Sequence, residues 1–317
     1  MNAPFFSVLV LTYNQENYIA QTLDSIIEQE HDYPYEIIVG EDCSTDGTRD
    51  VLLKYKEKYP DIITLILNEN NLGMIKNYFN TISRCSGKYI MQCAGDDYWL
   101  PGKVRAQIAF MENNPDTGMC CGNLQHLYPN GKQSVPSRSK GAIRFEELIM
   151  ECSVGAPTVC FRQTLLLKYI EAIDPVNRGW LMEDYPMWLW FAANSKIYCS
   201  DDVFTVHRIW EGSVSYPIGY NKIKEFILSV LSVKSFFLNI YKIPGLKEKS
   251  ENKLYIDLVG YAFKYKQFEE YRIYISKISS RNILYTIKKL IARHSWLFNL
   301  YYYYSKTLYP QAFRTCS

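Results

Sequence analysis

The chain has 317 residues, of which 48% are hydrophobic and 15% aromatic, and its formal net charge is +2. This composition excludes a chain too polar to fold, and it supplies enough apolar surface for one large domain with an appendage. The charge is unevenly distributed. Residues 242–317 carry 14 Lys and Arg against 5 Asp and Glu, whereas residues 1–241 carry 21 against 28. An acidic body with a basic tail predicts that the tail contacts an anionic partner, either a membrane surface or a nucleic acid.

The nine cysteines are scattered without a CxxC pair, and several lie in apolar runs where a buried thiol is the usual state. No zinc-site spacing and no disulfide framework is visible, so we expect a reducing, cytoplasmic compartment. The N-terminus shows no basic region of a signal peptide. No segment reaches ~18 uninterrupted apolar residues, so we expect no ordinary membrane-spanning helix.

The first third of the chain alternates between apolar runs and segments of helical periodicity. Strands are predicted at Phe6–Thr12, Tyr35–Val39, Ile62–Leu67 and Tyr89–Cys93, and helices at Gln15–Glu28, about 48–59 and Lys76–Arg84. This alternation predicts a parallel, doubly wound α/β sheet. Ligands of such sheets bind beyond the carboxyl ends of the strands.

Polar residues follow each of these four predicted strands. They are Thr12-Tyr13-Asn14, Glu41-Asp42, Asn68–Asn71 and Asp96-Asp97. Each group alone is a weak loop signal. Four such groups at one edge of one sheet predict a ligand site.

The adjacent carboxylates of Asp96 and Asp97 are the most informative of these groups. Burial of both without a cation costs several kcal/mol. Magnesium is usually held by one or two carboxylates together with substrate phosphates. The pair therefore indicates a metal–nucleotide site, and a solvated Asp-Asp turn is the alternative for a pair taken in isolation.

The rest of the chain shows three further apolar runs and then a long helical region. Strands are predicted at Gly118–Leu127, Ala156–Phe161 and Ile197–Val206, and a helix at Trp188–Ala193. We interpret Asp201-Asp202 as a solvated strand end. From about Tyr216 the pattern is helical to the end. We therefore expect an α/β domain over residues 1–215 and a helical, basic segment over residues 216–317.

Four strings carry a resemblance to a known family: SVLVLTYNQENYIAQTLDSI, EIIVGEDCSTDGT, NENNLGMIKNYFN and GKYIMQCAGDDYW. In order and spacing they resemble glycosyltransferase family 2, over about residues 5–215. The resemblance implies the GT-A, or nucleotide-diphospho-sugar transferase, fold with a doubly wound mixed sheet. It also implies an inverting transferase with a nucleotide-sugar donor, here expected to be UDP-linked, and a Mg²⁺ or Mn²⁺ cofactor.

The resemblance places candidate binding residues in the loops after the predicted strands. The candidates for the nucleotide are Thr12, Tyr13, Glu16, Glu41, Asp42, Asn71, Asn77 and Asp96, and those for the metal are Asp96 and Asp97. The first three are implied to border the base, and Glu41 and Asp42 to contact the uracil or ribose. For Asn71 and Asn77 a local capping role is the alternative.

The segment Trp180–Trp188 resembles the Glu-Asp motif of the family, which implies Asp184 as the catalytic base and Glu183 as the second candidate. Direct displacement needs a deprotonated acceptor hydroxyl, which a carboxylate within hydrogen-bond reach can provide. It also needs a stabilised diphosphate leaving group, whose charge a divalent cation neutralises. Metal-binding carboxylates must be ionised, whereas a base gains from a raised pKa, and the aromatic neighbours of Asp184 suit that role.

Two positions depart from the family pattern. Ala94 stands where relatives often place a third acid, and Trp210, in the segment His207–Ser215, stands where they often carry His. The chain also lacks the Gln-x-x-Arg-Trp motif of the processive polymerases of the family. This favours transfer of a single sugar to a glycan or lipid-linked acceptor, as in surface-polysaccharide assembly.

Two other function classes remain open. A nucleotidyltransferase also combines an α/β sheet with metal carboxylates, but it normally has a Gly-rich, basic loop after the first strand. The segment Thr12–Glu16 is not such a loop. A nucleotide-sugar or glycan-binding module with impaired catalysis is the other class, and Ala94 and Trp210 favour it.

The C-terminal tail, residues 271–317, contains eight Lys and Arg and no Asp or Glu. Basic and apolar residues alternate at roughly helical spacing, which predicts an amphipathic helix in the interface of an anionic membrane. Tyr301–Tyr304 are typical of a membrane-interface belt. A packed helical cap is the alternative, and a nucleic-acid partner is not expected. The predicted location is cytoplasmic, peripheral at the inner face of the membrane.

Overall fold

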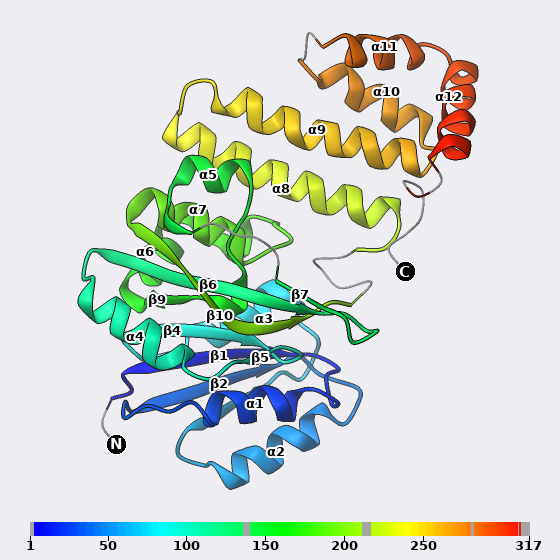
Figure 1. Cartoon of the computed structure of the whole chain (residues 1–317). Helices are drawn as coiled ribbons and strands as arrows, with labels where there is room; N and C mark the ends of the chain where they lie inside the picture. Colours follow the sequence, from blue (N-terminus) through cyan, green and yellow to red (C-terminus); the bar gives the residue numbers. More distant parts are fainter. Residues whose placement is uncertain (1–2, 136–139, 211–216, 280–281, 310, 312–317) are drawn as a thin grey trace. The chain divides into compact units, whose positions relative to one another are not determined.

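The computed structural model describes residues 3–135, 140–210, 217–279, 282–309 and 311 (Figure 1). The chain divides into two compact units, Met1–Trp210 and Glu211–Ser317. Each unit has a hydrophobic core of its own.

The first unit is built on one mixed sheet (Figure 1). Its strands are β1 (Phe6–Thr12), β2 (Tyr35–Glu41), β3 (Ile63–Leu67), β4 (Tyr89–Ala94), β5 (Tyr98–Trp99), β6 (Thr117–Leu127), β7 (Gln133–Ser134), β8 (Gly141–Ile143), β9 (Cys160–Arg162) and β10 (Lys196–Arg208). The strand order is β3-β2-β1-β4-β9-β6-β10-β5, with β7 beside β6 and β8 beside β10. Strands β1 to β4, β6 and β10 run parallel, and β9 lies antiparallel between β4 and β6.

Seven α-helices belong to the described part of this unit. They are α1 (Ile19–Ile27), α2 (Thr48–Lys58), α3 (Met74–Ile82), α4 (Lys103–Asn113), α5 (Phe145–Met150), α6 (Gln163–Ile173) and α7 (Asp184–Asn194). Helices α1, α2 and α4 bury apolar side chains in the core that Val8 and Val10 of β1 line. Helix α7 packs against β9, where the rings of Trp188 and Phe161 lie 5.9 Å apart. The predicted doubly wound mixed α/β sheet is confirmed.

The parallel pairing brings the ends of the first four strands to one edge. In the ladder register Thr12 lies opposite Glu41, and Glu41 lies opposite Leu67. On the other side of β1, Leu11 lies opposite Ala94. The loops that carry the predicted site residues therefore start side by side, because all four strands end at the same level of the sheet.

Two segments differ from the sequence prediction. Where one strand was expected at Ala156–Phe161, a 3₁₀ turn at Ala156–Thr158 precedes β9, since Pro157 has no N–H to donate to a ladder. Asp201-Asp202 is exposed as expected, but it lies within β10, where the register shifts between Cys199 and Val203. Helices α4, α5 and α6 were not anticipated.

The second unit is helical, as predicted. Its helices are α8 (Tyr220–Tyr241), α9 (Leu246–Lys264), α10 (Phe268–Lys277), α11 (Ile283–Ile291) and α12 (Ser295–Leu308). Leu258, Tyr271 and Phe298 are among the side chains that form its core. Among the described residues of the chain, no helix combines the length and apolar character needed to cross a membrane. The eight cysteines within the described residues are all free thiols.

Lys103, the first residue of α4, is fully buried beneath the sheet. Its ammonium donates a hydrogen bond to Gln107 Oε1 and lies 4.8 Å from the centre of the Trp99 ring. Burial lowers the pKa of Lys103 from 10.5 to about 8. The charged form is therefore poorly solvated in the folded state, and its burial reduces stability at neutral pH.

The Lys103→Met variant tests this burial through the pH dependence of unfolding. Between pH 8 and 10.5 the unfolded chain binds a proton that the folded chain has lost. The stability of the wild type should therefore rise with pH across this window, by about 3 kcal/mol at most, relative to the variant. Denaturant unfolding at pH 7 to 10 measures the difference. Lys54→Met, at an exposed position of α2, is the control, and its free energy of unfolding should follow that of the wild type at every pH. If the free energy of unfolding of Lys103→Met also changed with pH in parallel with the wild type, the burial effect assigned to Lys103 would be wrong.

Candidate active site

The loops after β1 and β2 hold each other through reciprocal hydrogen bonds. The main-chain N–H of Glu16 donates to Asp46 Oδ2 at 3.1 Å, and the N–H of Gly47 donates to Glu16 Oε2 at 2.6 Å. Asn14, at φ 52°, accepts a hydrogen bond from the N–H of Thr45 at 2.8 Å. These contacts fix the predicted site residue Glu16 at the edge of the sheet and leave the ring of Tyr13 exposed.

Asp42 fixes the loop after β3 to the end of β2. Its buried carboxylate accepts hydrogen bonds from the main-chain N–H of Leu72 at 2.8 Å and of Gly73 at 2.9 Å. A third comes from Asn68 Nδ2 at 3.0 Å, and Asn71 Nδ2 donates to the main-chain oxygen of Asp42 at 3.1 Å. Asp42 and Asn71 are thus brought together, as predicted, through contacts within the protein.

Glu41 and Asn77 also make internal contacts. The carboxylate of Glu41 is fully buried and forms an ion pair with Arg49, whose Nε donates at 2.7 Å. Asn77 Nδ2 donates to the main-chain oxygen of Gly40 at 3.1 Å, and its Oδ1 accepts from Asn68. Arg49 was not among the predicted site residues, and Asn68 was predicted only as part of the polar group after the third strand. The nucleotide contacts expected of Glu41 and Asn77 remain predictions.

Two polar atoms at the end of β1 are buried without a hydrogen-bonding partner among the described residues. They are Thr12 Oγ1 and Gln15 Oε1. A Cβ atom at Gly95 would come within 2.4 Å of Gln15 Oε1 and 2.8 Å of Thr12 Oγ1, so only glycine fits between β1 and Asp96. Buried polar atoms are normally paired in folded proteins. A polar ligand bound beside Asp96 could form the hydrogen bonds that these two atoms lack.

Asp96 and Asp97 lie directly after β4, and Asp97 is the more deeply buried of the two. Burial raises the pKa of Asp97 well above its ordinary value, and the charge of Asp96 raises it further. Burial also raises the pKa of Asp96, against the opposing charge of Arg208. The charge of Arg208 therefore compensates this pair only in part, and a divalent cation would supply further positive charge.

The donor set around this pair fits a cation shared with a phosphate ligand. The described residues contain no group of three or more His, Cys, Asp and Glu side chains that could hold a metal ion. Ala94 occupies the position of a possible third acid. Magnesium is typically held by one or two carboxylates plus substrate phosphates, which matches Asp96 and Asp97.

Arg208, the last residue of β10, reaches this acidic pair because β10 pairs with β5, which directly follows Asp97. Its main-chain N–H donates to Asp97 Oδ1 at 3.0 Å, and its guanidinium donates to the main-chain oxygen of Asp96 and to Gln21 Oε1. The guanidinium lies 4.8 Å from the centre of the Tyr18 ring and 5.0 Å from that of Tyr98. Sequence reasoning assigned Arg208 no role, because 111 residues separate it from Asp97.

The second acidic pair, Glu183-Asp184, stands at the start of α7. Burial raises the pKa of both carboxyl groups, and the charge of Asp184 contributes to raising that of Glu183 to about 8. With a pKa of about 8, Glu183 therefore holds a proton at neutral pH. Burial and the charges of this pair raise the pKa of Tyr78, whose hydroxyl donates to Gln92 Oε1 of β4 at 2.9 Å. An ionised carboxylate with a raised pKa suits a general base.

The two departures from the family pattern have different surroundings. Trp210 follows β10, and its ring lies 5.4 Å from that of Tyr18. His207 lies beside His126 of β6, with the ring centres 5.7 Å apart. The motif residues 211–215 lie outside the described residues.

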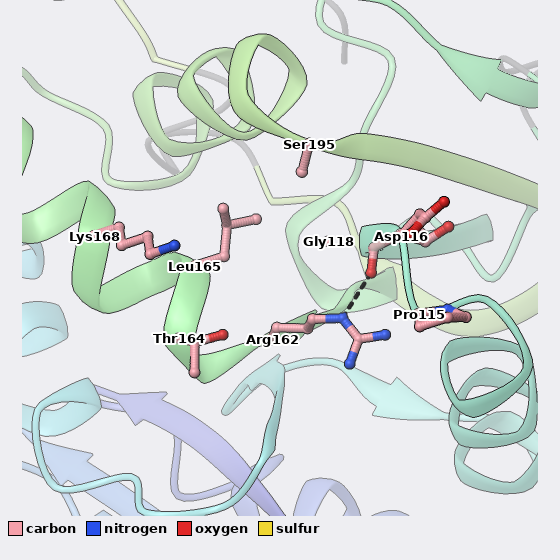
Figure 2. A pocket seen from close by; sticks show the side chains of 9 residues that line it. Pro115, Asp116, Gly118, Arg162, Thr164, Leu165, Lys168 and Ser195 are labelled. Atoms are coloured by element: carbon pink, nitrogen blue, oxygen red, sulfur yellow. Dashed lines mark hydrogen bonds between the residues drawn. The ribbon is translucent and has the colours of Figure 1, made fainter.

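A small cavity of about 160 Å³ lies at the amino ends of β6 and β10, and Figure 2 shows side chains that line it. Its lining includes Thr117 at the start of β6 and Ser195 just before β10. Arg162 Nε donates to the main-chain oxygen of Thr117 at 2.8 Å. Because ligands of parallel sheets bind at the carboxyl ends of the strands, this cavity is not the candidate active site.

Comparison with known proteins identifies the class. The model of the family "Glycosyl transferase family 2" matches residues 7–171, just over half of the chain. The crystal structure of S. aureus TarS 1–349 in complex with UDP-GlcNAc superimposes with a TM-score of 0.63 at 19% identity, over 96% of this chain and 91% of that one. The fold is therefore that of the GT-A glycosyltransferases. The chain belongs to glycosyltransferase family 2.

Other similarities extend over different shares of the chain. The UDP-Glc:alpha-D-GlcNAc-diphosphoundecaprenol beta-1,3-glucosyltransferase WfgD of Escherichia coli is 27% identical over 257 residues, 76% of this chain and 94% of that protein. The mannosyltransferase PcManGT of Pyrobaculum calidifontis, in complex with GDP-Man and Mn²⁺, superimposes with a TM-score of 0.58 at 16% identity, over 98% and 89% of the two chains. Three mycobacterial relatives are 34% identical over 126 residues, but the match spans only 36% of their length.

Arg208 is predicted to position the acidic pair. Arg208→Met should lower transfer roughly 100-fold, because it removes the cation beside Asp96 and the contacts that hold the end of β4. The turnover of Arg208→Lys should lie between that of Arg208→Met and that of the wild type. A lysine ammonium keeps the charge, but it cannot stack on aromatic rings or donate paired hydrogen bonds as a guanidinium does. Steady-state turnover and thermal unfolding measure the two effects. Arg105→Met, which breaks an exposed ion pair with Glu30, is the control, and wild-type turnover in Arg208→Met would refute the role.

Proposed function

We propose that this enzyme transfers a single sugar from a nucleotide sugar, UDP-linked, to a glycan or lipid-linked acceptor, with inversion at the sugar carbon. The proposed setting is the assembly of a surface polysaccharide. The proposed location is cytoplasmic, peripheral at the inner face of a membrane. Membership of glycosyltransferase family 2 supports the reaction class and argues against the nucleotidyltransferase alternative.

One observation carries the proposal most directly. Buried carboxylates whose charge is compensated only in part, Asp96 and Asp97, adjoin unpartnered polar atoms of Thr12 and Gln15 at the carboxyl edge of a parallel sheet. A nucleotide diphosphate with a divalent cation would satisfy both deficits at once, since its phosphates share the cation with the carboxylates and its polar groups meet the unpaired atoms. The loops fixed by Glu16 and Asp42 would then border the base and ribose.

Asp184 is proposed as the base that takes the proton from the acceptor hydroxyl as the new bond forms. Burial raises the pKa of Asp184, which makes its carboxylate a better proton acceptor than that of an exposed aspartate. Glu183, protonated at neutral pH, carries no competing charge. A divalent cation held at Asp96 would neutralise the charge developing on the departing diphosphate.

The donor and acceptor are inferred from similar proteins. TarS was crystallised with UDP-GlcNAc, and WfgD is described as a transferase from UDP-Glc to a sugar on diphosphoundecaprenol. These similarities support a UDP-sugar donor and a lipid-linked or glycan acceptor for this chain. The complex of PcManGT with Mn²⁺ supports the expected metal dependence.

The exchange Asp184→Asn tests the proposed base. With a panel of UDP-sugars and acceptors, the wild type should release UDP, and Asp184→Asn should lose transfer by several orders of magnitude. Donor binding measured by calorimetry should be nearly unchanged, because the base acts on the acceptor and not on the nucleotide.

Glu183→Gln is the matched variant for this experiment. Its neutral amide imitates the protonated Glu183, so turnover at neutral pH should persist. The assignment fails if Asp184→Asn loses nucleotide binding but keeps its turnover per bound donor, or if Glu183→Gln alone is inactive. Absence of transfer from every donor by the wild type, with UDP still bound, would favour the catalytically impaired binding module.

The exchange Asp96→Asn tests the metal site. It should remove most of the charge that would hold Mg²⁺ or Mn²⁺ and cut turnover by orders of magnitude while the fold survives. Turnover against Mn²⁺ concentration, with and without EDTA, is the measurement. Asp116→Asn, at an exposed surface ion pair with Lys196, is the control. Full activity of the wild type in EDTA would show that the metal role is wrong.

A further inference from the structure

Helix α11 exposes an apolar stripe that no part of the described chain covers. Ile283, Ile287 and Leu290 follow the spacing of one helical face, and their exposed fractions are 76%, 48% and 47%. No residue of α11 is classed as buried, although the helix is strongly amphipathic. Amphipathic helices in water-soluble domains normally turn their apolar stripe inward. The apolar stripe of α11 therefore requires a partner other than the core of its own unit.

Helix α12 repeats this arrangement on the face opposite to its packed side. Phe298 and Tyr302 face inward, and Phe298 belongs to the core of the helical unit. Trp296, Leu300 and Tyr304 project on the other side, each with about two thirds of its surface exposed. Trp and Tyr are enriched where proteins meet the membrane–water interface, because one end of the side chain is apolar and the other polar.

The positive charge of the C-terminal residues favours an anionic partner for these apolar stripes. Residues 271–317 carry eight Lys and Arg and no Asp or Glu. Of these, Arg293 and Lys306 are exposed on the described surface of α11, α12 and their connection. A second copy of the chain is a poor partner, because a two-fold contact would place two surfaces of the same positive charge against each other. An anionic lipid surface complements both the apolar stripes and the cations.

We propose that the α11–α12 surface, formed by Ile283, Ile287, Leu290, Trp296, Leu300 and Tyr304, lies in the interface of an anionic bilayer. The apolar side chains enter the acyl boundary, and Arg293, in the connection between the two helices, lies among the headgroups. This inference deepens the peripheral location proposed above and rests on it. It does not depend on the identity of the sugar or on the catalytic base.

Vesicle flotation of the full chain tests the proposal. The probes are vesicles of phosphatidylcholine alone and vesicles with ~30% phosphatidylglycerol, at low and high salt. The wild type should bind the anionic vesicles and be released by salt. The double variant Ile287→Glu/Leu300→Glu should lose at least tenfold in partitioning, since two exposed apolar contacts are replaced by charges that the headgroups repel. Arg293→Gln should lose roughly fivefold in partitioning.

Two matched controls separate this surface from general effects. Ile273→Glu changes an exposed apolar residue on α10, and Lys54→Gln/Lys132→Gln removes two exposed cations of the first unit. Both should float as the wild type does. All variants should retain UDP release with a water-soluble acceptor, so a failure of membrane binding is distinguished from a failure of the proposed function.

Three outcomes would overturn the proposal. One is equal flotation of wild type and Ile287→Glu/Leu300→Glu. Another is wild-type binding without preference for anionic lipid. The third is a lipid-free dimer, seen by sedimentation velocity, that Ile287→Glu/Leu300→Glu dissociates, because a second copy of the chain would then cover the α11–α12 surface.

Discussion

The burial of carboxylates at one edge of the sheet is the constraint on which the rest of the first unit depends. Parallel pairing ends β1, β2 and β4 at the same level, which concentrates acidic side chains there. Glu41 is neutralised by Arg49, and Asp42 is satisfied by main-chain N–H groups of the loop after β3. The contacts that compensate these two carboxylates also hold the loops after β2 and β3 in place. The requirement to compensate buried charge therefore orders the edge of the sheet.

Asp96 and Asp97 are the carboxylates that this network compensates least. The main-chain N–H of Arg208 reaches Asp97, yet the pKa of both acids stays raised by burial. A site that retains unneutralised charge is prepared to bind a cation with an anionic ligand, and pKa perturbations of this kind concentrate at functional sites. The same physical effect at Glu183-Asp184 has a different consequence. There burial raises the pKa of both carboxyl groups, which is the condition for the proton transfer proposed for this pair.

The helical unit follows a different logic. Its core is formed by apolar and aromatic side chains of α8, α9, α10 and α12, whereas α11 contributes mainly half-buried residues. A helix that buries so little of itself adds little to the stability of the unit. Contact with the proposed membrane surface therefore explains the large apolar side chains on the outer face of α11 better than a role in folding does.

The sequence by itself determined the elements and the chemistry they carry. Apolar runs and helical periodicity predicted the first four strands, their helices and the helical C-terminal region, because these signals are local. The contiguous Asp96-Asp97 pair was proposed from the sequence pattern, and Glu183-Asp184 from the family resemblance. Only the tertiary structure decided which residues meet across the sheet. Arg208 contacts Asp96 and Asp97 from more than 100 residues away, and Asn68 joins Asp42 to Asn77. Such contacts arise from strand order and register, which no local pattern encodes.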